Sequence, residues 1–184
     1  MRQIRRINLY GGPGCNKSTF AARLFADLKD YSKQSSNNFQ VELCREYIKE
    51  KAWEGIKPVG FDQNFIFAEQ QRREEILLRN GVDVVVTDCP LALMVTYATL
   101  YKVPTVGAIR DMVMAHEEVY PGLHILLSRN CPYNPAGRYQ TESEAIEIDK
   151  RIETTMQSLF GHTYHVANSY DELLSIVMKS CFTY

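Results

Sequence analysis

Near its start the chain reads Gly11-Gly12-Pro13-Gly14-Cys15-Asn16-Lys17-Ser18-Thr19. This segment follows an apolar run at residues 4–10, which predicts a β-strand, and precedes residues 20–28, whose apolar spacing predicts an amphipathic helix. A loop between a strand and a helix is the setting in which the pattern G-x-x-x-x-G-K-[ST] binds phosphate. Glycines let backbone N–H groups approach phosphate oxygens, and the helix start adds its positive dipole end. The segment therefore predicts a nucleotide-phosphate site.

Individual roles within this loop follow from the pattern. Lys17 is expected to reach the β- and γ-phosphates of ATP and to be catalytic, and the Ser18 hydroxyl is expected to hold Mg²⁺. Further contacts to ATP are expected from the rest of the loop, namely Gly12, Pro13, Gly14, Cys15, Asn16 and Thr19. The alternative is a glycine-rich turn before a helix that binds no ligand.

Asn16 is the one departure from the pattern, because it stands where the second glycine is expected. Asn is among the residues that best tolerate a left-handed backbone, so the loop can still close if this position is left-handed. If the position requires a conformation open only to glycine, the loop is strained and nucleotide affinity is lower.

Composition places the chain among ordinary globular proteins. It has 184 residues, a formal net charge of -1, and no export signal or apolar stretch of membrane length. We therefore expect a single domain over residues 1–184 in the cytoplasm (the host cytoplasm if the gene is phage-encoded), without a membrane partner. The five cysteines are scattered without metal-ligand spacing, which favours reduced thiols over disulfides or zinc.

Strand and helix patterns alternate along the rest of the chain. The predicted strands are residues 4–10, 39–43, 82–87, 123–128 and 164–167. The predicted helices are residues 20–28, 48–53, 61–80, 91–101, 106–118, 143–158 and 171–178, and residues 31–38 are predicted as a polar surface loop. In the helix at 61–80, the apolar residues at helical spacing include Phe61, Phe65, Ala68 and Ile76. This order predicts a three-layer α/β domain with a mostly parallel five-stranded sheet flanked by helices.

Two carboxylates follow predicted strands and are expected to share a cleft with the loop, because ligands gather at the carboxyl ends of parallel strands. Asp88 is expected to hold Mg²⁺ and to be catalytic, and its alternative role is to cap the helix that starts at Pro90. Glu46 is expected to act as base toward an acceptor hydroxyl, and its alternative is a surface ion pair with Lys49 or Lys51.

Positive and aromatic side chains supply the remaining candidates. Residues 129–141 form an irregular segment, predicted to be a mobile lid, in which Arg129 would contact the nucleotide and Arg138 the transferring phosphate. Arg45, Tyr47 and Arg72 are candidates for acceptor binding. The alternatives are a solvated loop for the lid arginines, a charged outer helix face for Arg72 and core packing for Tyr47.

Together these motifs resemble the small P-loop kinases of nucleosides and related metabolites. The chain is most similar to the ribosylnicotinamide-kinase domain of bacterial NAD-regulatory proteins and to phage relatives labelled AAA-type ATPases. The shared residues are the phosphate loop, Arg45-Glu46-Tyr47, a Gln-rich helix, Thr87-Asp88 and the Ile125-Leu126-Leu127 strand before an arginine-bearing lid. The family has glycine at the position of Asn16, and its second carboxylate near the third strand is replaced here by Cys89-Pro90.

The resemblance implies transfer of the γ-phosphate of ATP, with Mg²⁺, to a hydroxyl of a nucleoside, a nucleotide or a related metabolite. One alternative acceptor is a hydroxymethylated base within DNA, which the absence of a strongly basic stripe disfavours. The other alternative is a P-loop ATPase or regulatory nucleotide-binding module without kinase activity.

Overall fold

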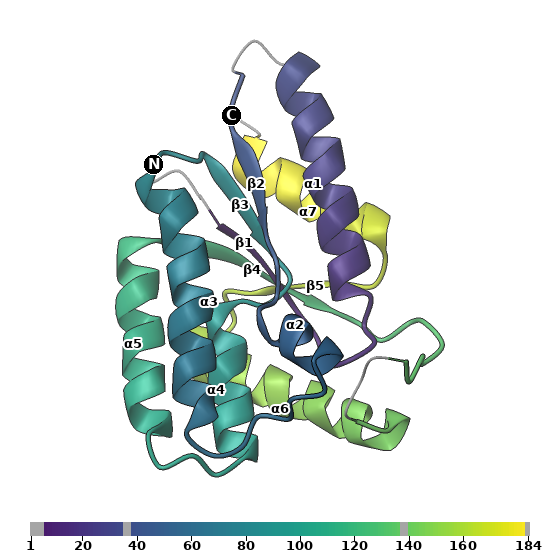
Figure 1. The fold of residues 1–184 in the computed structure, drawn as a ribbon. Helices are drawn as coiled ribbons and strands as arrows, with labels where there is room; N and C mark the ends of the chain where they lie inside the picture. The colour runs from purple at the N-terminus through teal and green to yellow at the C-terminus, as the bar shows by residue number, and fades with distance from the viewer. Residues whose placement is uncertain (1–5, 35–37, 137–139, 183–184) are drawn as a thin grey trace.

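A computed structural model of the chain describes residues 6–34, 38–136 and 140–182. Within these residues it contains five strands and seven helices that alternate along the chain (Figure 1). The strands are β1 (Arg6–Tyr10), β2 (Val41–Cys44), β3 (Val84–Thr87), β4 (Gly122–Leu127) and β5 (His165–Ala167). The helices are α1 (Lys17–Gln34), α2 (Ile48–Trp53), α3 (Asp62–Arg79), α4 (Leu91–Leu100), α5 (Val106–Val119), α6 (Glu142–Phe160) and α7 (Tyr170–Phe182).

The strands form one sheet in the order β2-β3-β1-β4-β5, and every neighbouring pair is parallel. Because β1 is central, its carboxyl end opens the phosphate loop in the middle of the sheet edge where ligands collect. The predicted three-layer α/β fold is confirmed, and the sheet is wholly rather than mostly parallel. β3 is buried along its whole length, as its run of valines predicts.

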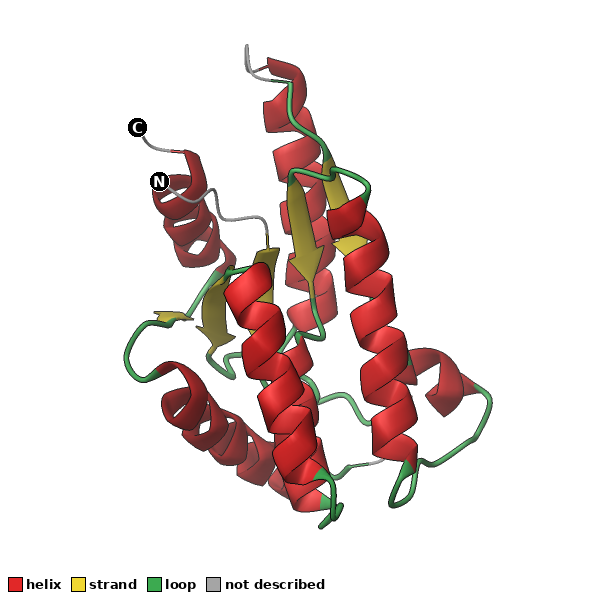
Figure 2. Ribbon diagram, turned by 90° about the vertical axis from the view of Figure 1, so that its left-hand side faces the viewer, coloured by secondary structure: helices red, strands yellow, loops and turns green. Residues whose placement is uncertain are grey.

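Helices cover both faces of the sheet (Figures 1 and 2). On one face, Ile7 and Leu9 of β1 pack in a cluster with Leu24 of α1 and Leu173 of α7. On the other face, helices α3, α4, α5 and α6 enclose a second cluster that includes Tyr10. Because successive side chains of a strand alternate between faces, β1 contributes to both clusters.

The second face also buries charge. Arg6 donates from Nη1 to Glu74 Oε2 on α3 (3.2 Å), lies 2.7 Å from His116 Nδ1 on α5, and pairs with Glu117. Burial raises the pKa of Glu74 to about 7, whereas burial and the charge of Arg6 lower the pKa of His116 to about 4. These buried ionic groups connect the start of β1 to the two helices that cover it.

Two sequence predictions are wrong in detail. The loop predicted at residues 31–38 is partly helical, because α1 continues to Gln34. The apolar residues noted in α3 face outward, with Phe61 and Phe65 each 62% exposed. The buried face of α3 instead carries Gln63, Ile66, Phe67, Gln70, Glu74 and Leu78. This polar face can be buried because Arg6 pairs with Glu74 and the amide N–H of Tyr47 donates to Gln70.

Candidate active site

The phosphate loop turns sharply between β1 and α1 through residues with positive φ. Gly14 has φ 86° and Asn16 has φ 56°. Asn16 therefore occupies the left-handed region that asparagine tolerates, which confirms the sequence argument that this position can close the loop without glycine. Its carbonyl accepts the N–H of Phe20 at 2.9 Å and so begins the hydrogen-bonded ladder of α1.

A pocket of about 310 Å³ begins at this loop. Its first part is lined by Pro13, Gly14, Cys15, Asn16, Lys17, Ser18 and Thr19. The Lys17 ammonium donates to the Gly12 carbonyl at 3.0 Å, so its side chain folds back across the loop. All of these lining residues were predicted to take part in binding ATP or its magnesium ion. Gly12, which was also predicted to contact ATP, does not line the pocket.

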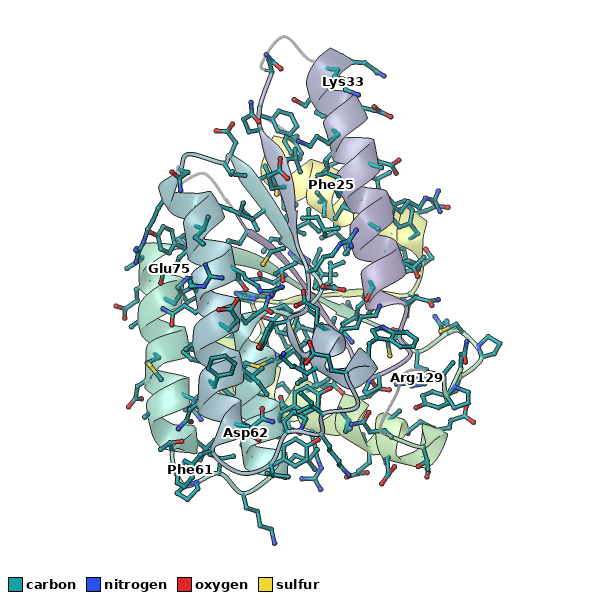
Figure 3. The ribbon with its side chains drawn as sticks, in the orientation of Figure 1. Phe25, Lys33, Phe61, Asp62, Glu75 and Arg129 are labelled. Carbon is teal, nitrogen blue, oxygen red and sulfur yellow. The ribbon has the colours of Figure 1, made fainter. Side chains whose placement is uncertain are left out.

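Two residues that follow β4 in the chain, Arg129 and Asp149, hold the phosphate loop at Gly12 and Pro13, and we refer to this pair as the clamp. The Gly12 N–H donates to Asp149 Oδ1 on α6 at 2.6 Å. Arg129 donates from Nε to Asp149 Oδ2 at 2.7 Å and from Nη2 to the Pro13 carbonyl at 2.8 Å. Figure 3 shows Arg129 between the start of α1 and α6. A side chain on Gly12 would not fit, because a Cβ atom there would lie 2.4 Å from Asp149 Oδ1.

The clamp also affects the thiol in the loop. Cys15 donates from Sγ to Asp149 Oδ1 at 3.3 Å, and burial followed by the charge of Asp149 raises the pKa of Cys15 to about 11. The thiol is therefore protonated at neutral pH. All five cysteines of the chain are free, as expected from their spacing.

Asp149 was not among the residues that the sequence singled out. It lies in a charged helix beside Glu147 and Lys150, and nothing local distinguishes it from those exposed neighbours. Its partner Gly12 is 137 residues away along the chain. Only the fold brings the two together.

Asp88 and Glu46 meet at the carboxyl ends of β3 and β2. Asp88 is buried, and its Oδ1 accepts the backbone N–H of Glu46 at 3.1 Å. Its Oδ2 makes no hydrogen bond to a described residue. The alternative role as a helix cap is not observed, because the N-cap of α4 is Pro90, without a side-chain cap bond. Glu46 lines the pocket beyond the phosphate loop, and Lys51 pairs with Glu54 instead.

Gln70 of α3 fixes the turn after β2. Its Oε1 accepts the backbone N–H of Tyr47 at 3.0 Å, and its Nε2 donates to the Arg45 carbonyl at 3.5 Å. Gln70 is fully buried, so it holds this turn from inside the protein. Because Glu46 lies between Arg45 and Tyr47, these bonds also fix the position of its backbone.

The second part of the pocket is mainly apolar and aromatic. Its lining consists of Glu46, Ile48, Lys49, Ala52, Trp53, Pro58, Gln63, Ile66, Met94, Tyr97 and Tyr101, with Ala136 and Gln140 from the loop before α6. The rings of Tyr97 and Tyr101 stack with centroids 6.4 Å apart. Burial and the nearby charge of Glu46 raise the pKa of Tyr97 well above its ordinary value, so its hydroxyl is protonated at neutral pH. We refer to this part as the acceptor chamber.

Three of the predicted site residues, the acceptor-binding candidates Tyr47, Arg45 and Arg72, do not line the pocket. Tyr47 is buried behind the chamber, where its ring contacts Phe65 edge-on at 5.8 Å and lies under the guanidinium of Arg73. Arg45 is exposed and does not line the pocket. Arg72 is exposed and donates to Glu69, which agrees with the alternative of a charged outer helix face. Arg138 lies outside the described residues, so the structure does not test it.

Two of the predicted residues, Ser18 and Asp88, supply oxygen donors of a type that Mg²⁺ takes. The exposed Ser18 side chain lines the pocket, and Asp88 retains one oxygen without a hydrogen bond to a described residue. Mg²⁺ in nucleotide sites takes few protein ligands and completes its shell with phosphate oxygens and water. A closed cage of three or more His, Cys, Asp or Glu side chains is not found among the residues described. The site therefore fits a nucleotide-bound magnesium ion.

A comparison with protein families finds a match for residues 6–172 to the family AAA_28, described as an AAA domain. The chain belongs to this family. The match begins at the first residue of β1 and includes the phosphate loop, Asp88, Arg129 and Asp149. No curated protein matches this AAA domain.

Solved structures share its fold at low sequence identity. A crystal structure of NadR protein in complex with NR superposes with a TM-score of 0.73 at 14% identity, covering 98% of this chain and 52% of that chain. NadR protein in complex with NAD and AMP-PNP gives 0.69 at 13% identity, covering 98% and 50%. Thymidylate kinase from Ehrlichia chaffeensis gives 0.62 at 14% identity, covering 95% and 97%.

These comparisons confirm the predicted resemblance at the level of the fold, which the chain shares with NadR protein and thymidylate kinase. The AAA domain spans about half the length of the NadR chains that it matches. Among the described residues, no helix is long and apolar enough to cross a membrane.

Proposed function

We propose that the protein is an ATP-dependent phosphotransferase that moves the γ-phosphate to a hydroxyl of a nucleoside, a nucleotide or a related metabolite. The observation that supports this most directly is the pocket, which is lined both by the phosphate loop and by the acceptor chamber with Glu46. A kinase needs two adjoining sites, one for the nucleotide and one for the hydroxyl that attacks it. A nucleotide-hydrolysing module needs only the first.

The phosphate loop is the proposed donor site. Its backbone N–H groups and the start of α1 would bind the phosphates, and Lys17 would leave the Gly12 carbonyl to contact the β- and γ-phosphates. Ser18 and Asp88 would hold the magnesium ion, which neutralises charge on the phosphates when it is bound.

Glu46 is the proposed base. It lines the acceptor chamber in the same pocket as the phosphate loop, where a carboxylate can accept the proton of an attacking hydroxyl. The bond from its backbone N–H to Asp88 ties its position to the proposed metal ligand. Arg129 is placed to stabilise the loop through Asp149 and Pro13, and it belongs to the proposed lid at residues 129–141.

The proposal is tested by measuring ADP release with ATP and Mg²⁺ over a panel of acceptors. The panel contains nucleosides, nucleoside monophosphates, nicotinamide riboside, and DNA with and without a hydroxymethylated base. We expect acceptor-dependent ADP release with a small molecule, and a loss of about 10²–10³-fold in kcat for Lys17→Ala. Glu46→Gln should lower kcat with little change in ATP binding.

Three outcomes would contradict the proposal. Equal ADP release with and without every acceptor would indicate an ATPase, and nucleotide binding without turnover would indicate a binding module. Turnover with modified DNA alone would assign the acceptor to nucleic acid. Circular dichroism of the Lys17→Ala protein serves as the control for folding.

A further inference from the structure

Gln63 in the first turn of α3 lines the acceptor chamber and is only 4% exposed. Its backbone N–H donates to the Gly60 carbonyl at 3.3 Å. Its side-chain carboxamide makes no hydrogen bond to any residue that the structure describes. Because Gln63 lines the pocket, its donor and its acceptor are available to a ligand bound there.

The other amide side chains of α3 provide a direct comparison. Asn64 accepts the Thr105 hydroxyl at 2.7 Å, Gln70 binds the turn after β2, and Gln71 donates to Glu75 at 2.7 Å. Each of these three is bonded within the protein. Gln63 is the one whose side chain has no hydrogen-bond partner in the described part of the chain, and among the four it is the one that lines the pocket.

The surroundings of Gln63 fit a planar ring. Trp53, Ile66 and Met94 supply apolar surface, and the stacked rings of Tyr97 and Tyr101 supply flat aromatic surface. Ligand sites of this kind bind mainly through apolar contacts and use a few polar groups to fix orientation. A carboxamide presents a donor and an acceptor side by side, which matches the edge of a base carrying the complementary pair.

We propose that Gln63 selects the acceptor by hydrogen-bonding the edge of its ring, so that the acceptor is a nucleoside or nucleotide whose base presents a donor beside an acceptor. This proposal rests on the phosphotransferase function proposed above. In this arrangement the base lies against the aromatic side chains, and the sugar hydroxyl extends toward Glu46. Gln63 is then a specificity residue that takes no part in the phosphoryl transfer itself.

The test compares kcat/KM for ADP release with uridine, cytidine, adenosine, nicotinamide riboside, their monophosphates, and ribose or ribose 5-phosphate as acceptors without a base. Gln63→Leu is expected to lower the ratio of kcat/KM for the preferred nucleoside to that for the base-free acceptor by about 10- to 100-fold. Gln63→Glu can only accept and places a carboxylate beside the acceptor atom of the base, so it is expected to lower the same ratio at least about tenfold. Gln71→Leu on the same helix, outside the pocket, is the matched control and should leave this ratio unchanged.

The outcomes separate the two proposals. If the wild-type protein releases no ADP with any acceptor, the phosphotransferase function fails and the role of Gln63 fails with it. If the wild type is active but the ratio is unchanged in the Gln63 variants, the function stands and the role of Gln63 is overturned. If thermal unfolding shows that Gln63→Leu does not fold, the same ratio measured for Gln63→Glu decides.

Discussion

Removing the Asp149 carboxylate should destabilise the protein and weaken nucleotide binding together. Asp149→Ala deletes the acceptor for the Gly12 N–H at 2.6 Å and the partner of Arg129 at 2.7 Å. Hydrogen bonds to charged groups contribute about 1.5–3 kcal/mol each. The Asp149 side chain is 25% exposed and the Arg129 side chain 14%, so solvent screens part of this contribution. We therefore expect a loss of about 2–3 kcal/mol in the free energy of unfolding.

Two measurements check this expectation. The thermal midpoint should fall by about 4–10 °C for a chain of this size. The Kd for ATP, measured by titration calorimetry, should rise about tenfold, because binding must then also order the loop. Gly12 does not line the pocket, so Asp149 holds the loop from behind and does not compete with phosphate.

Glu147→Ala is the matched control. Glu147 lies on the same helix, is about half exposed, and pairs with Lys150 and Arg151 on the surface. Its loss should change stability by no more than about 0.5 kcal/mol and leave ATP binding unchanged. An Asp149→Ala protein with wild-type stability, or with tighter ATP binding, would refute the reasoning.

Three further predictions concern the loop, the turn after β2 and the buried charges. Asn16→Ala should cost about 1–2 kcal/mol in urea denaturation because its φ is 56°, whereas Asn16→Gly should lie within about 0.5 kcal/mol of the wild type; equal losses would argue against backbone strain. Gln70→Leu leaves the N–H of Tyr47 unpaired, so it should lower stability by about 1–3 kcal/mol and raise KM for the acceptor more than KM for ATP; the reverse order of KM effects would contradict a role for this turn on the acceptor side. The third prediction concerns the buried charges. The raised pKa of Glu74 (about 7) makes the folded state bind more protons than the unfolded state, so this group makes stability fall as pH rises from 4.5 to 7. The lowered pKa of His116 (about 4) makes the folded state bind fewer protons, so this group makes stability rise between pH 4 and 6.5. The wild-type free energy of unfolding should therefore change little between pH 4.5 and 6.5, and that of His116→Asn should fall by about 1 kcal/mol per pH unit; parallel profiles in urea titrations of the two proteins would exclude this linkage.

Local sequence was enough to predict the phosphate loop and a parallel sheet of five strands, although not the order of the strands. The loop pattern is contiguous, and the left-handed backbone of Asn16 is one of the two possibilities that the sequence left open. Alternating strand and helix patterns predict a parallel sheet because each helix returns the chain to the same end of the sheet. For these features the determining residues are neighbours in sequence.

The remaining features depend on partners that are far away along the chain. Glu74 is buried because Arg6, 68 residues earlier, supplies the opposite charge. The buried face of α3 is therefore not the face that the spacing of its apolar residues indicates. Gln63 differs from Gln71 in lining the pocket and in having no side-chain hydrogen bond to a described residue, and both are properties of the folded structure. Sequence periodicity contains no information about such pairings.

The central place of β1 has a consequence for biosynthesis. β1 is made first, but it pairs with β3 around Val85 and with β4 around Leu123. The ribosome must therefore release the chain beyond Leu127 before the strand that opens the phosphate loop has both neighbours. Under the proposed function, nascent chains that end before β4 should be unable to retain ATP, so retention of ATP would indicate that synthesis has passed this point.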